Sequence, residues 1–153
     1  MKNKTKVILL LLLTIPISNF YFVGAQSGIR NGLNYSSAGW SYTTSTTTLR
    51  RDFELFEDNG MNLICLAVHW DKTQPYRDSD RYDTGFLDNI VRVCTTADDY
   101  GIEVIIDFHT LYDQGYGMPS FISPNRFATV VTSSSARQEW LEMQEYVINY
   151  LES

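Results

Sequence analysis

The chain has 153 residues, of which 44% are hydrophobic and 20% charged, a globular balance that excludes a disordered protein. This length suffices for one ordinary domain, but a complete eight-unit β/α barrel needs roughly 250 residues. Eighteen acidic residues against 12 Lys and Arg give a formal net charge of −6. Such a surface repels phosphate backbones, so we do not expect nucleic acid as a partner.

The first 25 residues have the layout of a secretory signal peptide. Three lysines precede an apolar run over residues 7–17, and small side chains at the end of the segment suit cleavage after Ala25. The apolar run is shorter than the ~20 residues of a spanning helix, so an N-terminal membrane anchor is the less favoured alternative. We expect a secreted protein without stable membrane insertion after cleavage. Residues 26–153 then hold 18 acidic and nine basic residues, a net charge of −9.

From residue 26 onward, apolar runs typical of strands alternate with the 3.6-residue apolar spacing of helices. We expect strands over 29–35, 61–70 and 102–109, and helices over 46–59, 83–100 and 135–152. A long loop over 110–134 precedes the last helix, which a Ser135–Gln138 capping box is expected to start. The order β-α-β-α-β-α predicts an α/β fold with a parallel sheet built from three βα units.

The two cysteines, Cys65 and Cys94, lie in a predicted strand and on a predicted apolar helix face. We therefore expect two separately buried thiols rather than a disulfide, although export would permit one. The chain has neither a Cys-x-x-Cys motif nor a Cys/His spacing typical of metal sites, and we expect no cofactor.

Parallel α/β proteins bind ligands at the C-terminal ends of their strands. Strand alternation predicts that Asp107 and His109 face away from the helices, into the barrel. The same parity in the preceding strand would place His69 beside His109. A structural Asp–His hydrogen bond that closes the strand stays open as an alternative. The candidate ligand-binding residues at or above the strand ends are Asn34, Tyr35, His69, Trp70, Asp107, His109 and Tyr112.

Two ligand classes suit this set of side chains. His69, Asp107 and His109 offer imidazole and carboxylate groups of the kind that bind zinc or manganese, so a metal-dependent barrel hydrolase or isomerase is one alternative. The many aromatic residues predicted around the strand ends favour sugars, because aromatic rings pair with the flat C–H faces of pyranoses. A non-catalytic carbohydrate-binding protein is a further alternative.

Three segments resemble glycoside hydrolase family 5, the cellulase family, or a near relative in the same clan of barrels. Residues 60–70 read Gly-Met-Asn-Leu-Ile-Cys-Leu-Ala-Val-His-Trp, similar to the family's Gly-x-Asn-x-(Val/Ile)-Arg-(Ile/Leu)-Pro-x-x-Trp strand. Residues 107–109 match the Asp-(Leu/Phe)-His that ends its third strand, and residues 32–35 resemble its first strand. The resemblance covers most of 28–152. It implies that 26–153 is the N-terminal portion of a (β/α)8 TIM-barrel domain, namely its first three βα units.

The resemblance also implies retaining hydrolysis of a β-linked polysaccharide such as cellulose or mannan by two glutamates about 5 Å apart. The family's glutamates come from strands four and seven. We expect this chain to stop within the third helix of the barrel, before the strands that carry these two glutamates. We therefore expect it to be inactive alone. The resemblance makes His109 a hydrogen-bonding residue beside the cleaved sugar and Trp70 part of the cleft.

Two positions depart from the family pattern. Cys65 stands where the family has the arginine that supports the nucleophile, and Ala67 stands where it has the following proline. A cysteine cannot supply the fork of donors of a guanidinium group.

Overall fold

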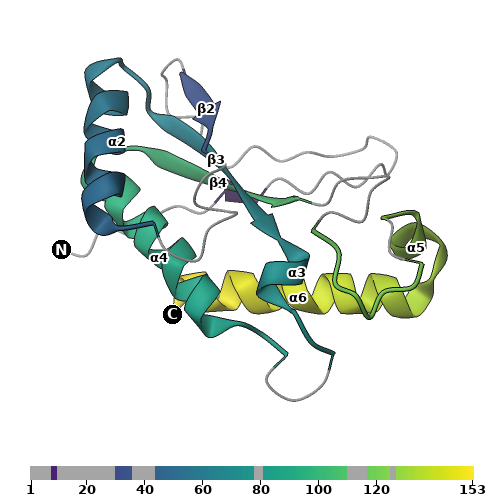
Figure 1. The fold of residues 1–153 in the computed structure, drawn as a ribbon. Helices are drawn as coiled ribbons and strands as arrows, with labels where there is room; N and C mark the ends of the chain where they lie inside the picture. The colour runs from purple at the N-terminus through teal and green to yellow at the C-terminus, as the bar shows by residue number, and fades with distance from the viewer. Residues whose placement is uncertain (1–7, 10–29, 36–43, 78–80, 110–116, 125–126) are drawn as a thin grey trace.

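The computed structural model describes residues 8–9, 30–35, 44–77, 81–109, 117–124 and 127–153 (Figure 1). The predicted cleavage point after Ala25 and the candidate Tyr112 lie outside these residues. The elements in chain order are β1 (Ile8–Leu9), β2 (Gly32–Asn34), α2 (Thr46–Asp58), β3 (Leu63–His69), α3 (Trp70–Thr73), α4 (Thr84–Asp99), β4 (Glu103–His109), α5 (Phe127–Thr132) and α6 (Ser134–Glu152).

The strands form one parallel sheet in the order β1-β4-β3-β2. From β2 onward, each strand is followed by at least one helix, so the three predicted βα units are present. The long strands β3 and β4 pair along their whole length, from Leu63 opposite Glu103 to His69 opposite His109. Two residues of the predicted signal peptide form the short strand β1 beside β4, a pairing that the sequence did not indicate.

Helices α2, α4 and α6 lie on one side of the sheet (Figure 1). The predicted alternation of the strands is confirmed, because every second residue is buried on the helix side from Ile64 to Val68 in β3 and from Val104 to Ile106 in β4. Each of these aliphatic side chains stabilises the fold by roughly 1.5–3 kcal/mol relative to an exposed position. They are Ile64, Leu66, Val68, Val104 and Ile106, which are all at most 4% exposed.

The boundaries of α2 and α4 follow from local sequence. Ser45 and Asp83 cap their N-termini, each side chain accepting a hydrogen bond from a backbone N–H three residues later. Gly60 and Gly101 follow their C-terminal caps with φ of 69° and 65°, a left-handed conformation that glycine adopts without strain. These caps and glycines explain where the two helices begin and end.

The segment before α6 differs from the prediction. The expected loop over 110–134 contains helix α5, and the N-cap of α6 is Ser133 rather than Ser135. Ser133 has the extended backbone that an N-cap needs, and its side chain accepts from the N–H of Ala136. Ser135 lies inside the first turn of the helix, and Gln138 donates to Glu142 instead of closing a capping box.

Both cysteines are free, as predicted. Cys94 is buried, and burial raises the pKa of its thiol to about 12. Cys65 is half-buried on the face of the sheet away from the helices. Within the ranges that the structure describes, no helix is both long and apolar enough to cross a membrane.

Candidate functional site

Two histidines lie side by side where β3 and β4 end. The parallel register places His69 directly opposite His109, and their ring centroids are 5.9 Å apart. Asp107 lies two residues before His109 on the same face, and its Oδ2 atom is 3.0 Å from His109 Nδ1. The side chains of Asp107 and His109 are each 38% exposed, so the pair can meet a ligand. The predicted juxtaposition of these three residues is confirmed.

The Asp107–His109 hydrogen bond orients the imidazole ring. When the carboxylate accepts the proton of Nδ1, His109 Nε2 becomes a hydrogen-bond acceptor. An acceptor held in one orientation suits a hydroxyl group of a ligand. The structural hydrogen bond and the binding site that we considered as alternatives are thus compatible with each other.

Gly117 lies against the two histidines. A Cβ atom on Gly117 would lie 2.8 Å from His69 Nδ1 and 2.9 Å from the carbonyl oxygen of His109. Its φ of 76° also favours glycine, and its carbonyl accepts from the N–H of Asp71. Only a residue without a side chain fits here. Sequence reasoning missed Gly117, because one glycine in a glycine-rich loop carries no distinguishing signal.

Burial determines the charge state of His69. The side chain is 3% exposed, and this burial lowers the pKa of His69, with nearby Asp71 opposing the effect. A lowered pKa keeps the imidazole neutral at pH 7. The ends of β3 and β4 therefore hold a buried, neutral imidazole at His69 beside the half-exposed imidazole of His109, and His109 is the one that a ligand can reach.

Tyr35 does not face this site, contrary to the prediction. It is 6% exposed and packs on Phe53 and Phe56 of α2, with ring centroids 5.4 and 5.8 Å apart. Its hydroxyl donates to Asp52 on the same helix. The reason is strand alternation, since Tyr35 follows Asn34 and so points to the opposite side of the sheet.

Trp70 is also wrongly predicted as a residue that faces the ligand. It is fully buried, and its ring packs edge-on against Trp140 of α6, with centroids 5.0 Å apart. Its indole Nε1 donates to the buried Gln74 Oε1 over 2.8 Å. Because Trp70 directly follows His69, it points to the helix side of the sheet.

Asn34 lies on the open side of the sheet, as predicted for a binding residue. It is exposed and stands opposite Cys65 in the register between β2 and β3. Burial and the neighbouring Asp107 both raise the pKa of the Cys65 thiol, which is therefore neutral where the family pattern has an arginine. A shallow pocket of about 200 Å³ opens here, lined by Gly32, Leu33, Asn34, Leu63 and Cys65.

The described residues offer no ligand set for a metal centre, the alternative considered above. No group of three or more His, Cys, Asp or Glu side chains there is arranged to hold a metal ion. His69, Asp107 and His109 are adjacent, but Asp107 is bonded to His109 instead of sharing a centre with both histidines.

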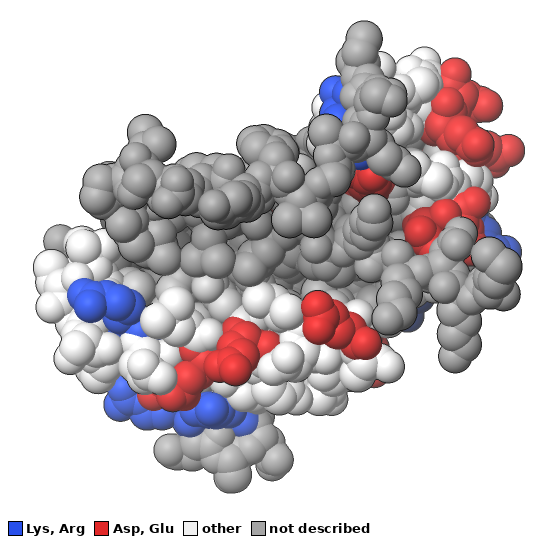
Figure 2. Space-filling model, turned by 180° about the vertical axis from the view of Figure 1, so that it is seen from behind, with Lys and Arg blue, Asp and Glu red and all other residues white. Residues whose placement is uncertain are grey.

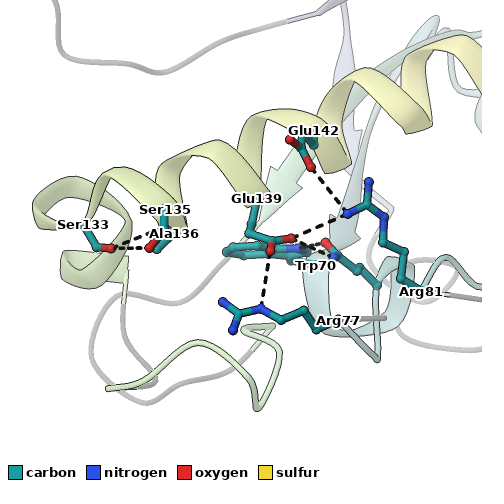
Figure 3. A network of polar contacts seen from close by, with 9 residues as sticks. Trp70, Arg77, Arg81, Ser133, Ser135, Ala136, Glu139 and Glu142 are labelled. Carbon is teal, nitrogen blue, oxygen red and sulfur yellow. Dashed lines mark hydrogen bonds and ion pairs between the residues drawn. The ribbon is translucent and has the colours of Figure 1, made fainter. Parts of the chain in front are cut away.

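The described glutamates lie away from the C-terminal ends of the strands. Glu103 is at the start of β4, where it pairs with Arg30 at 2.7 Å. Glu139 and Glu142 lie on α6. The side chain of Glu139 is 19% exposed and binds Gln74 and Arg77 (Figure 3).

Acidic and basic groups are interspersed on the molecular surface. On the face that Figure 2 shows, basic atoms along the lower edge lie beside acidic ones. Arg77 and Arg81 illustrate this mixing, since both pair with glutamates of α6.

One family model matches most of the chain. The family model described as Cellulase (glycosyl hydrolase family 5) matches residues 24–150. No curated protein gives a significant match.

Two solved structures share the fold. One is a family 5 subfamily 18 variant from Bifidobacterium longum subsp. longum in complex with Manβ1-4GlcNAc, at TM-score 0.63 and 15% identity over 81% of this chain. The other is an exo-β-1,4-mannosidase from Opitutaceae bacterium strain TAV5, at TM-score 0.65 and 16% identity over 82% of this chain. This chain spans 30% and 22% of their lengths. The described α/β fold is therefore part of a TIM barrel, and the chain belongs to glycosyl hydrolase family 5.

Proposed function

We propose that this chain forms part of the substrate-binding face of an exported, retaining glycoside hydrolase that acts on a β-linked polysaccharide such as mannan or cellulose. One observation carries the proposal. His69, Asp107 and His109 meet on the open face of the sheet, at the C-terminal ends of adjacent parallel strands. Barrel enzymes place their active sites at that end of the strands.

The residues have distinct roles in this proposal. Asp107 holds the His109 ring, and His109 binds a sugar hydroxyl beside the bond that is cleaved. Neutral His69 lines the same face, and Asn34 and Tyr112 provide further polar contacts to neighbouring sugars.

Retaining hydrolysis requires two carboxylates about 5 Å apart that flank the glycosidic bond. None of the described glutamates lies at the C-terminal end of a strand. We therefore propose that both catalytic glutamates of the active enzyme are supplied by other barrel strands, and that this chain alone does not hydrolyse glycans. Incubation with soluble glucans and mannans should release no reducing ends, and measurable turnover would refute this part of the proposal.

Sugar binding can be tested directly on the purified chain. One structural neighbour is bound to Manβ1-4GlcNAc and the other is an exo-β-1,4-mannosidase, so mannotriose is the first ligand to titrate, with cellotriose as the comparison. We expect mannotriose or cellotriose to shift the NMR signals of the His69 and His109 rings. The shift of the His69 ring should vanish in His109→Ala, and the shifts of both rings should persist in Glu145→Gln, a matched change at an exposed position of α6. Titration shifts that survive His109→Ala would contradict the proposed site.

Metal content distinguishes the proposed glycosidase from the alternative of a metal-dependent enzyme. Stoichiometric zinc or manganese that is lost in His69→Ala would favour the metal-dependent enzyme over a glycosidase.

Export is tested by intact mass after expression in a secreting host, where the mature chain should begin at Gln26. Cleavage there would also remove strand β1, which lies within the proposed signal peptide.

A further inference from the structure

The turn that follows His69 is too short to hold its own shape. Helix α3 has four residues, well below the length at which an isolated helix is stable in water. Its conformation must therefore come from contacts with the rest of the molecule. This turn also contacts the two residues on either side of the histidine site, because the Thr73 hydroxyl donates to the carbonyl of His69 and the N–H of Asp71 donates to the carbonyl of Gly117.

A chain of buried hydrogen bonds ties this turn to α6. Trp70 Nε1 donates to Gln74 Oε1 over 2.8 Å, and Gln74 Nε2 donates to Glu139 Oε2 over 3.2 Å. The side chains of Trp70 and Gln74 are fully buried. A buried amide costs free energy unless its donors and acceptors are satisfied, so this chain of bonds favours one geometry of the turn. Glu139 is the acceptor at its end.

Two arginines surround the carboxylate of Glu139 (Figure 3). Arg77 Nε is 3.4 Å from Glu139 Oε1, and Arg81 Nη1 is 3.9 Å from Glu139 Oε2. The Arg77 guanidinium also lies over the ring of Phe121, 5.5 Å from its centroid. Glu142, one turn further along α6, contacts only Arg81 among these groups, at 3.4 Å. Of these two glutamates, Glu139 is therefore the one that connects the ion pairs with the arginines to the buried side-chain amide of Gln74.

We propose that Glu139 is a positioning residue for the histidine site. Through Gln74 and Trp70 it fixes α3, and α3 fixes His69 and Asp71 where β3 ends. The link between Glu139 and the His69 ring is a property of the unliganded chain. Only its relevance to sugar binding rests on the proposed function.

The test compares variants of the chain by NMR without any sugar. The signals to follow are the Trp70 indole N–H, the Gln74 side-chain amide and the His69 ring, assigned with Trp70→Phe, Gln74→Leu and His69→Gln. We expect Glu139→Ala to shift all three signals. Glu139→Gln keeps an acceptor oxygen in place and should shift them less. Glu142→Ala is the matched control, because it removes an Arg81 pair and leaves the buried amide untouched.

The position of the His69 ring signal decides the outcome. If it moves no further in Glu139→Ala than in Glu142→Ala, while the Trp70 signal does move, then Glu139 only stabilises the helix contact and the proposal is overturned. Should Glu139→Ala fail to fold, Glu139→Gln must still move the His69 signal more than Glu142→Ala does. A later titration with mannotriose tests the proposed function separately, so a chain that binds no sugar can still show this coupling.

Discussion

Replacing Gly117 with alanine should destabilise the chain more than the same change at other glycines with positive φ. Gly60, Gly101 and Gly117 all have φ between 65° and 76°, a region that costs an alanine about 1–2 kcal/mol. At Gly60 and Gly101, an added Cβ meets nothing within 4 Å. At Gly117 it would meet His69 Nδ1 at 2.8 Å, and such overpacking typically costs a further ~1–3 kcal/mol.

We therefore expect Gly117→Ala to lower the free energy of unfolding by roughly 2–5 kcal/mol, against about 1–2 kcal/mol for Gly60→Ala and Gly101→Ala. Urea unfolding followed by far-UV circular dichroism measures all three changes. Gly117→Ala should also shift the ring signals of both histidines, which the two controls should leave in place. A loss no larger than that of the controls, together with unmoved histidine signals, would show that the loop does not lie against His69.

Three further predictions concern single side chains. Since the pKa of the Cys94 thiol is raised to about 12, Cys94 should resist alkylation at pH 8 in the folded chain and react once urea unfolds it; fast reaction in the native state would contradict its burial. Because burial lowers the pKa of His69, its contribution to stability is present above its unfolded pKa of about 6.5 and is lost as the pH falls through the lowered folded value. His69→Gln should thus flatten the decline in unfolding free energy between about pH 7 and pH 5, and an unchanged slope would contradict this contribution of His69. Tyr35→Phe should cost roughly 1 kcal/mol in urea unfolding, because it removes the hydrogen bond to Asp52 but keeps the ring.

Periodicity in the sequence predicted most of the fold. The alternation over 102–109 identified which side chains of β4 face the helices, and the strand parity placed His69 beside His109. Helix α5 was not predictable in this way, since its sequence Phe-Ala-Thr-Val-Val-Thr is rich in β-branched residues with weak helix propensity. It packs against α6, so tertiary contact outweighs the local preference.

The errors in the site have a shared physical cause. Asn34 with Tyr35, and His69 with Trp70, were treated as pairs at strand ends, although adjacent strand residues point to opposite faces. Gly117 and Glu139 were missed because their partners are distant in sequence. Gln74 lies 65 residues before Glu139, and no local pattern connects them.

The register of β3 and β4 has a consequence for how this chain can tolerate changes in length. His69 faces His109, and Ala67 faces Asp107, only while both strands keep their present spacing. Inserting or deleting one residue within either strand would reverse the direction of every side chain on one side of the change. The site would then turn toward the helices while apolar residues faced water. Insertions are therefore expected to be tolerated in the connections between elements, and a one-residue insertion inside β4 should abolish the site even if the sheet still forms.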